Sequence, residues 1–213
     1  MASIHHRAAL FAALGDPIRL EIAEELSRSD RTPGELVEKF ELSSALLAHH
    51  LDVLESAGLI ERTESHADRR KRFVRLVERH RPLLVGAPAA TSVTFVCRQN
   101  SARSQLAAAI WQRIVGTTAT SAGTAPATAV HPLTVQVARQ HQLDLRRAVP
   151  LQYFASQTRG KTVITVCDQS HDDLKRPLSR LHWSLRDPVK DGTMAAFEAT
   201  YQELVERITP LSK

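Results

Sequence analysis

Residues 97–104, with the sequence Cys-Arg-Gln-Asn-Ser-Ala-Arg-Ser, combine a sulfur nucleophile with groups that can bind an oxyanion. The apolar run 92–96 before Cys97 indicates a strand, and residues 102–115 have helical spacing. A loop between a strand and a helix can turn successive N–H groups towards one anion, and the helix N-terminus adds partial positive charge. Arg103 can bind two anion oxygens with its planar guanidinium. The spacing therefore predicts a tetrahedral oxyanion site beside a thiol.

Cys97 is the predicted nucleophile of this loop. A field that binds an anion also favours the thiolate form of a cysteine, and a thiolate beside a bound oxyanion can attack phosphorus or arsenic. The alternative interpretation is a buried cysteine at a strand end without a chemical role. We expect the oxyanion to contact the loop and first helical residues, namely Arg98, Gln99, Asn100, Ser101, Ala102, Arg103 and Ser104.

The elements that must position this loop follow from the pattern of residues 92–213. Apolar and β-branched runs predict four strands, and helical spacing predicts helices that alternate with them. This order predicts an α/β domain with a four-stranded, doubly wound parallel sheet, whose site lies at the carboxyl end of the first strand. The strands are expected at 92–96, 117–121, 162–166 and near 181–184, and the helices at 102–115, 130–141, 193–210 and, as a short turn, 151–156.

Residues 1–80 have a different, α+β pattern. Three short helices, a further helix and a basic hairpin predict a winged helix-turn-helix domain. Pro82, Gly86 and Pro88 interrupt the residues that follow, so we expect 81–91 to be a linker. The helices are expected at 3–13, 17–29, 33–40 and from Ser43 or Ser44 to Gly58, and the hairpin strands at 59–64 and 72–77.

Three segments of the first domain, residues 14–20, 42–54 and 55–60, resemble the ArsR-type repressors and occur in the same order. The resemblance implies a cytoplasmic regulator, usually a homodimer, that binds double-stranded DNA with residues 43–57 in the major groove. Residues 60–81 hold eight Lys or Arg against four acids, as expected where a surface meets phosphates. The DNA contacts implied are Ser44, Ala45, Ala48 and His49 on the helix and Arg69, Arg70, Lys71 and Arg72 at the hairpin tip.

The first domain also departs from that family. Thiol-based metal sensing there uses cysteines on the DNA-binding domain, but residues 1–96 contain none. The histidines fit no ligand set and no Cys-x2-Cys spacing occurs, so no metal site is predicted. The interrupted region 81–91 replaces the long helix that usually builds the dimer, which leaves the dimer interface open.

Four segments of the second half, residues 96–105, 121–124, 165–168 and 182–188, together resemble low-molecular-weight protein tyrosine phosphatases. More narrowly, they resemble the arsenate reductases built on that fold. The resemblance implies that Cys97 is the nucleophile, that Arg103 holds the oxyanion and that Asp187 protonates the leaving oxygen. It also implies that Asn100 shapes the loop and that Ser104 donates to the thiolate.

Cys167 distinguishes reduction from simple hydrolysis, because reduction needs a second thiol. It lies in the segment where thioredoxin-coupled arsenate reductases keep their resolving cysteine, but their further cysteine seven residues on is Leu174 here. Either a Cys97–Cys167 disulfide forms, or a small thiol attacks the adduct first. No bound cofactor is expected, only an external reductant of the thioredoxin, mycothiol or glutathione type. Val189 follows Asp187-Pro188, where phosphatases of this fold usually have an aromatic residue.

Composition limits the surroundings of the protein. Its 213 residues are 43% hydrophobic and include two cysteines, which favours two small domains or one large one in a reducing compartment. No apolar stretch approaches the roughly 18 residues of a membrane span, and the N-terminus lacks an apolar signal core. A cytoplasmic protein without a membrane partner is expected.

We therefore expect a DNA-binding transcriptional regulator fused to a domain that reduces arsenate to arsenite. Two alternatives stay open. The first is a transcription factor whose phosphatase-like half only senses an oxyanion or an oxidant. The second is a protein tyrosine phosphatase.

Overall fold

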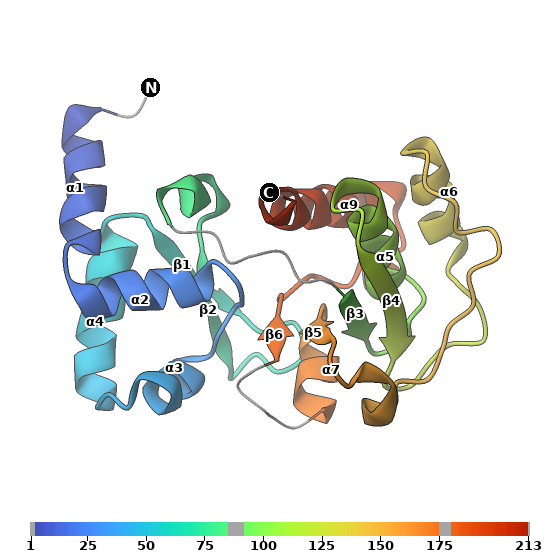
Figure 1. Cartoon of the computed structure of the whole chain (residues 1–213), viewed down its shortest axis with the longest axis horizontal. Coiled ribbons are helices and arrows are strands. Elements are labelled where there is room, and N and C mark those ends of the chain that lie inside the picture. The colour runs from blue at the N-terminus through green and yellow to red at the C-terminus, as the bar shows by residue number, and fades with distance from the viewer. Residues whose placement is uncertain (1–2, 85–91, 175–179, 213) are drawn as a thin grey trace. The chain divides into compact units, whose positions relative to one another are not determined.

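The computed structural model describes residues 3–84, 92–174 and 180–212. The chain divides into two compact units, Met1–Ala87 and Pro88–Lys213 (Figure 1). Each unit has its own apolar core, around Ile22, Leu36 and Leu54 in the first and around Phe95 and Trp111 in the second. None of the helices in the described ranges is both long and apolar enough to cross a membrane.

The first unit consists of four helices and an antiparallel hairpin, as expected of a winged helix-turn-helix domain. Local capping explains where the helices begin: Asp16 and Ser43 accept N–H bonds in the first turns of their helices, and Thr32 forms a capping box with Glu35. Ile60 pairs with Leu76 across the hairpin. The elements are α1 (Ile4–Leu14), α2 (Pro17–Leu26), α3 (Pro33–Phe40), α4 (Ser44–Ser56), β1 (Ile60–Glu64) and β2 (Arg72–Leu76).

The expected linker begins with ordered structure. A 3-10 helix, η1 (Glu78–Leu83), follows the hairpin, His80 is buried, and Leu84 packs against the first core. Pro82 lies inside this short helix and, having no N–H, donates no hydrogen bond to it. The remaining linker residues, 85–91, lie outside the described residues.

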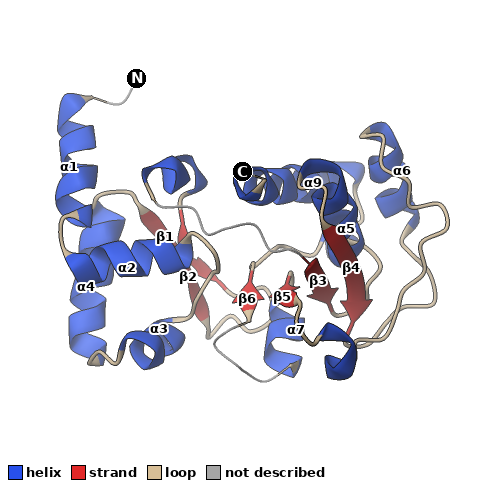
Figure 2. Cartoon of the chain, in the orientation of Figure 1, coloured by secondary structure: helices blue, strands red, loops and turns tan. Residues whose placement is uncertain are grey.

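The second unit contains a four-stranded parallel sheet in the order β4-β3-β5-β6, which confirms the predicted α/β fold (Figure 2). The register brings Cys97 opposite Gly123 and Val96 opposite Thr165. β3 and β5 are thus neighbours in the sheet although β4 lies between them in the chain. The strands are β3 (Ser92–Cys97), β4 (Thr118–Gly123), β5 (Thr162–Thr165) and β6 (Leu181–His182).

Helices cover this sheet and frame its carboxyl edge. α5 contacts β3 and β4, while α7 contacts β3 and β5. Two short helices, α7 and α8, were not predicted, because six and four residues are too few to show a helical period. The helices are α5 (Arg103–Ile114), α6 (Pro132–Gln140), η2 (Ala155–Thr158), α7 (Asp168–Asp173), α8 (Pro188–Asp191), α9 (Met194–Ile208) and η3 (Thr209–Leu211).

Candidate functional site

The loop between β3 and α5 turns its carbonyl groups outwards. Each of four loop carbonyls accepts an N–H bond from the segment that follows β4. Because a trans peptide directs its C=O and its N–H to opposite sides, the N–H groups of these peptides point away from the segment after β4, and those of Arg98 and Asn100 donate to Cys167 Sγ and Cys97 Sγ. The bonds join Thr124 to Cys97 (3.1 Å), Ala125 to Arg98 (2.8 Å), Ala127 to Gln99 (2.9 Å) and His131 to Ser101 (3.0 Å).

Asn100 fixes the shape of the loop. Its backbone has a left-handed φ of 50°, which asparagine tolerates better than most residues, and its side chain is fully buried. The Asn100 Oδ1 atom accepts bonds from the Leu151 N–H (2.8 Å) and Gln105 Nε2 (3.1 Å). The Asn100 side chain therefore ties the loop both to α5 and to the segment around Leu151.

Cys97 lies at the end of β3 with 2% of its surface exposed. Its Sγ accepts the Asn100 N–H (3.2 Å) and lies 3.0 Å from the Ser104 hydroxyl oxygen. Asn100 Nδ2 donates to that same oxygen (2.8 Å). The Cys97 sulfur is thus held by the Asn100 N–H and by a hydrogen bond with the Ser104 hydroxyl.

Gly123 allows the loop to approach β4. A Cβ atom added there would lie 2.7 Å from the Arg98 carbonyl oxygen and 3.0 Å from the Asn100 Cβ atom. The glycine backbone itself bonds Leu151 and Tyr153, both at 2.8 Å. Only a residue without a side chain fits between these segments.

Arg103 is the first residue of α5 and is 7% exposed. Nη1 donates to the Leu185 carbonyl (3.0 Å), and Nη2 forms an ion pair with Asp187 (2.9 Å). Its Nε is buried and has no hydrogen-bond partner among the described residues. A buried N–H without a partner is costly, so this donor is available for an oxyanion.

Cys167 lies directly against the loop. It follows β5, caps α7 and accepts the Arg98 N–H at its Sγ (3.2 Å). The register pairs Val96 with Thr165, so Cys97 and Cys167 follow neighbouring positions of β3 and β5 by one and two residues. Burial raises the pKa of the Cys167 thiol, and the positive charge of Arg103 opposes that effect. Both cysteines are free thiols.

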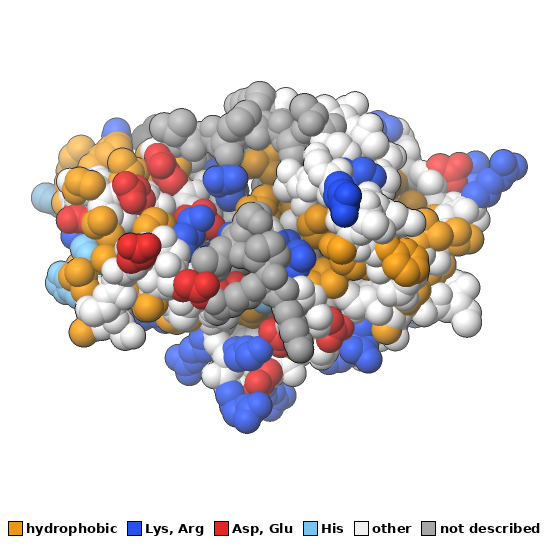
Figure 3. Space-filling view, turned by 60° about the horizontal axis from the view of Figure 1, so that its bottom comes forward, with side chains coloured by type: hydrophobic (Ala, Val, Ile, Leu, Met, Phe, Trp, Pro, Cys, Tyr) orange, Lys and Arg blue, Asp and Glu red, His pale blue; other side chains and the backbone are white. Residues whose placement is uncertain are grey.

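The predicted DNA contacts lie on the surface of two elements of the first unit. The residues predicted on α4 are all exposed, namely Ser44, Ala45, Ala48 and His49, and so are those predicted at the hairpin tip, Arg69, Arg70, Lys71 and Arg72. Figure 3 shows Lys and Arg side chains gathered on one projecting part of the surface, as expected of such a tip. The Arg70 guanidinium forms two bonds to Asp68, both 3.0 Å, so part of its charge is already compensated.

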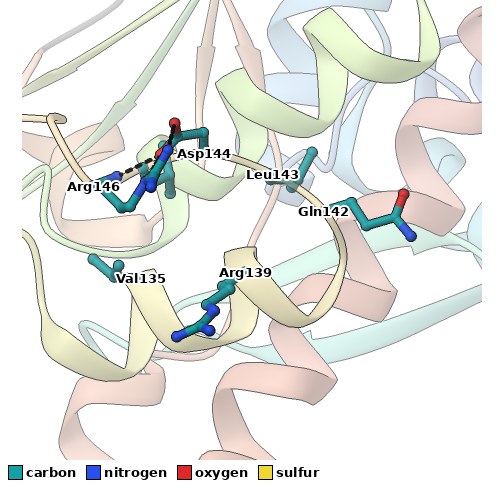
Figure 4. Close-up of a pocket in the computed structure, with 7 residues that line it drawn as sticks. Val135, Arg139, Gln142, Leu143, Asp144 and Arg146 are labelled. Carbon is teal, nitrogen blue, oxygen red and sulfur yellow. Dashed lines mark hydrogen bonds and ion pairs between the residues drawn. The ribbon is translucent and has the colours of Figure 1, made fainter.

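A hollow of about 480 Å³ lies elsewhere on the second unit (Figure 4). Residues of the oxyanion loop do not line it. Its acidic residue, Asp144, is held by Arg146 through bonds of 2.9 and 2.8 Å, which keep the pKa of that carboxyl well below its usual range. No group of three or more His, Cys, Asp or Glu side chains within the described ranges is arranged to hold a metal ion.

Three contributors to the site were not predicted. Gly123 belongs to the motif at residues 121–124, and the sequence predicts no role for Gln105 or Ser170. Their roles depend on contacts between distant segments, such as the bond from Gln105 Nε2 to the Val149 carbonyl (3.2 Å). A Cys-x-x-Ser spacing after a strand was the one available indication for Ser170.

Residues 92–213 match the family model of low molecular weight phosphotyrosine protein phosphatases. The chain belongs to this family. Residues 16–62 match the family model of bacterial regulatory proteins of the arsR family. The expected fusion of these two kinds of domain is thereby confirmed.

The comparisons with individual proteins concern one unit each. The transcriptional repressor SdpR of Bacillus subtilis is 37% identical over 51 residues, which are 24% of this chain and 57% of the repressor. The chain thus spans little more than half the length of that curated relative. The Erwinia amylovora tyrosine phosphatase AmsI has a TM-score of 0.51 at 21% identity and covers 59% of this chain and 93% of its own, a likeness that shows the fold. A Corynebacterium glutamicum thioredoxin-dependent arsenate reductase is 26% identical, with a TM-score of 0.47, and covers 58% of this chain and 60% of its own.

Proposed function

We propose that this protein is a DNA-binding regulator whose second unit reduces arsenate to arsenite with two thiols. The observation that carries the proposal is the bond from the Arg98 N–H to Cys167 Sγ, since it holds a second thiol against the loop that bears Cys97. A phosphatase of this fold needs only the first thiol. Reduction needs a second thiol, and Cys167 is placed to supply it.

The first step forms a bond between Cys97 Sγ and arsenic. One As–O bond breaks, and the departing oxygen takes a proton from Asp187 and leaves as water. The oxyanion is held by the loop N–H groups and by Arg103, whose Nε has no other partner among the described residues. Asp187 pairs with Nη2 of the same guanidinium at 2.9 Å, which brings an acid to the rim of the loop.

The second step forms the Cys97–Cys167 disulfide. Cys167 Sγ attacks Cys97 Sγ, the S–As bond breaks, and its electron pair passes to arsenic, which is reduced from As(V) to As(III). The proton of Cys167 goes to an arsenic oxygen, and arsenite leaves. An external thiol reductant, of the thioredoxin, mycothiol or glutathione type, then returns two electrons and two protons to the disulfide.

The first unit would bind DNA through α4 and the hairpin tip. Exposed Ile4 and Phe11 lie on α1, 69% and 57% accessible, and support assembly into a homodimer through that helix.

The thiol chemistry requires a reducing compartment, which supports a cytoplasmic location.

The test is arsenite production by the full chain with arsenate and each class of thiol reductant. We expect turnover with one of them, none in Cys97→Ser, and an arsenate-dependent disulfide that Cys167→Ser abolishes. Hydrolysis of an aryl phosphate, which needs Cys97 alone, should persist in Cys167→Ser. Full arsenate reduction by Cys167→Ser with a protein reductant, or no turnover by the wild type, would overturn the proposal.

Tyrosine phosphatase activity is the second candidate, supported by the matched family and by Asp187 near Arg103. Trp183, one of the few aromatics near Asp187 in sequence, is 2% exposed in the core and cannot bind a substrate ring. A third candidate is a non-catalytic sensor, favoured by the confinement of both cysteines to the second unit. DNA affinity measured with and without arsenate, phosphate or peroxide tests it, and unchanged affinity throughout rejects it.

A further inference from the structure

We propose that Ser170 is a positioning residue that holds the Cys167 sulfur beside the loop and controls where its proton goes. The inference rests on the proposed reduction and concerns its second step, in which Cys167 Sγ attacks Cys97 Sγ.

Ser170 contacts the Cys167 sulfur with two groups. Its backbone N–H donates to Sγ (3.3 Å), and its hydroxyl oxygen accepts the thiol hydrogen across 3.2 Å. The Arg98 N–H supplies a third contact of the sulfur, at 3.2 Å. Ser170 thus provides two of these three contacts, and it is fully buried.

The same hydroxyl also reaches the other cysteine-bearing segment. It lies within donor distance of the Cys167 carbonyl (2.9 Å) and of the Val96 carbonyl (3.2 Å), directly before Cys97. One buried side chain therefore spans the ends of β3 and β5. Since a disulfide requires a narrow range of separations, a group that ties these ends together sets the approach of the two sulfurs.

The hydroxyl can serve both protonation states of the thiol. It accepts from the S–H group while donating to a carbonyl, and after proton loss it can rotate and donate to the thiolate. Burial raises the pKa of Cys167, and the hydrogen bonds from the Ser170 side chain and backbone act in the opposite direction. Ser104 stands in a similar relation to Cys97, 3.0 Å from its sulfur.

The first experiment titrates Cys167 in a Cys97→Ser background, where it is the only cysteine. The ultraviolet absorbance of the thiolate is followed against pH. Loss of a hydrogen bond to a charged group corresponds to an upward shift of about one pH unit in Ser170→Ala. Thr94→Val is the matched control, because it removes a buried hydroxyl of β3 whose bond, within the described ranges, is to Thr120, and it should leave the titration unchanged. Ser170→Thr restores the hydroxyl and should restore the midpoint.

The second experiment measures disulfide formation after one addition of arsenate to the otherwise native chain. A rise of one unit in the pKa of Cys167 lowers the thiolate fraction about tenfold but raises the nucleophilicity of the thiolate about threefold. The changed pKa alone therefore slows disulfide formation in Ser170→Ala about threefold. A positioning role requires a larger loss that persists at a pH above the titration midpoint.

The outcomes separate the two proposals. If the wild type forms no arsenate-dependent disulfide, the reductase proposal fails, and the titration still decides the influence of Ser170 on the thiol. If Ser170→Ala folds, titrates like its parent and forms the disulfide at the wild-type rate, the role of Ser170 is refuted. Thermal melting of each variant verifies folding, and Ser170→Gly, which also removes the hydroxyl, replaces Ser170→Ala if the latter does not fold.

Discussion

Replacement of Gly123 by alanine should damage the oxyanion loop more than the fold. The new Cβ would lie 2.7 Å from the Arg98 carbonyl oxygen, whereas ordinary contacts begin at 3.4 Å. The loop backbone must therefore move by about 0.7 Å, because the opposing atoms are backbone and a buried side chain. Such overpacking typically costs about 1–3 kcal/mol of stability.

The effect on binding follows from the position of the displaced atoms. The Arg98 N–H bonds Cys167 Sγ and the Asn100 N–H bonds Cys97 Sγ, so movement of these two residues displaces the loop together with both sulfurs. Displacements near 1 Å cost about a hundredfold in positioned chemistry. We expect Gly123→Ala to bind phosphate or arsenate about ten- to a hundredfold more weakly, measured by calorimetry. The rate of aryl phosphate hydrolysis should fall in parallel.

Gly34→Ala is the matched control, since a Cβ there meets nothing within 4 Å. It should leave anion affinity unchanged and alter thermal stability little. Wild-type anion affinity in Gly123→Ala would refute the conclusion that this close contact sets the shape of the loop.

Three further predictions concern the loop, the hairpin tip and a buried histidine. Asn100→Ala should lower the unfolding free energy in urea by about 1–3 kcal/mol, because it leaves buried donors without an acceptor, and an unchanged midpoint would contradict this. Arg69→Gln should reduce the slope of log affinity against log salt by about one in DNA titrations. Asp68→Asn should strengthen DNA binding, because it releases Arg70 from its bonds to Asp68. An unchanged salt slope in the first variant and weaker DNA binding by the second would argue against DNA contact by the hairpin tip. Burial lowers the pKa of His80 below 6.5, so the unfolded chain binds a proton at a higher pH than the folded chain does. The first unit should therefore lose stability as the pH falls through about 6.5. Denaturation at several pH values measures this dependence, which His80→Gln should weaken.

Local signals in the sequence predicted most of the elements. Asp16-Pro17, Thr32-Pro33 and Ser43 mark helix starts through caps that act within one turn, and the structure places the helices there. The loop from Cys97 to Arg103 was likewise predictable, since its function depends on neighbouring residues. Short elements such as α7 and α8 lack the length that a period requires.

The contacts between distant segments could not be derived from the chain order. Cys167 lies near Cys97 because β5 pairs with β3, although β4 comes next in sequence. The Leu151 N–H bonds the Asn100 side chain, which lies 51 positions earlier in the chain, and no local pattern predicts such a bond. The direction of Arg103 Nε also depends on Leu185 and Asp187, which hold the other end of its guanidinium.

The ion pair between Arg103 and Asp187 means that a bound anion and the Asp187 carboxylate would compete for the same guanidinium. An incoming anion competes with a carboxylate that is already in place, so a weakly charged or spherical ion gains little by arriving. A tetrahedral dianion gains more, because its several oxygens reach the loop amides together with Nε and do not depend on displacing the carboxylate. We therefore expect the site to bind tetrahedral dianions more tightly than the common monovalent ions of the surrounding solution.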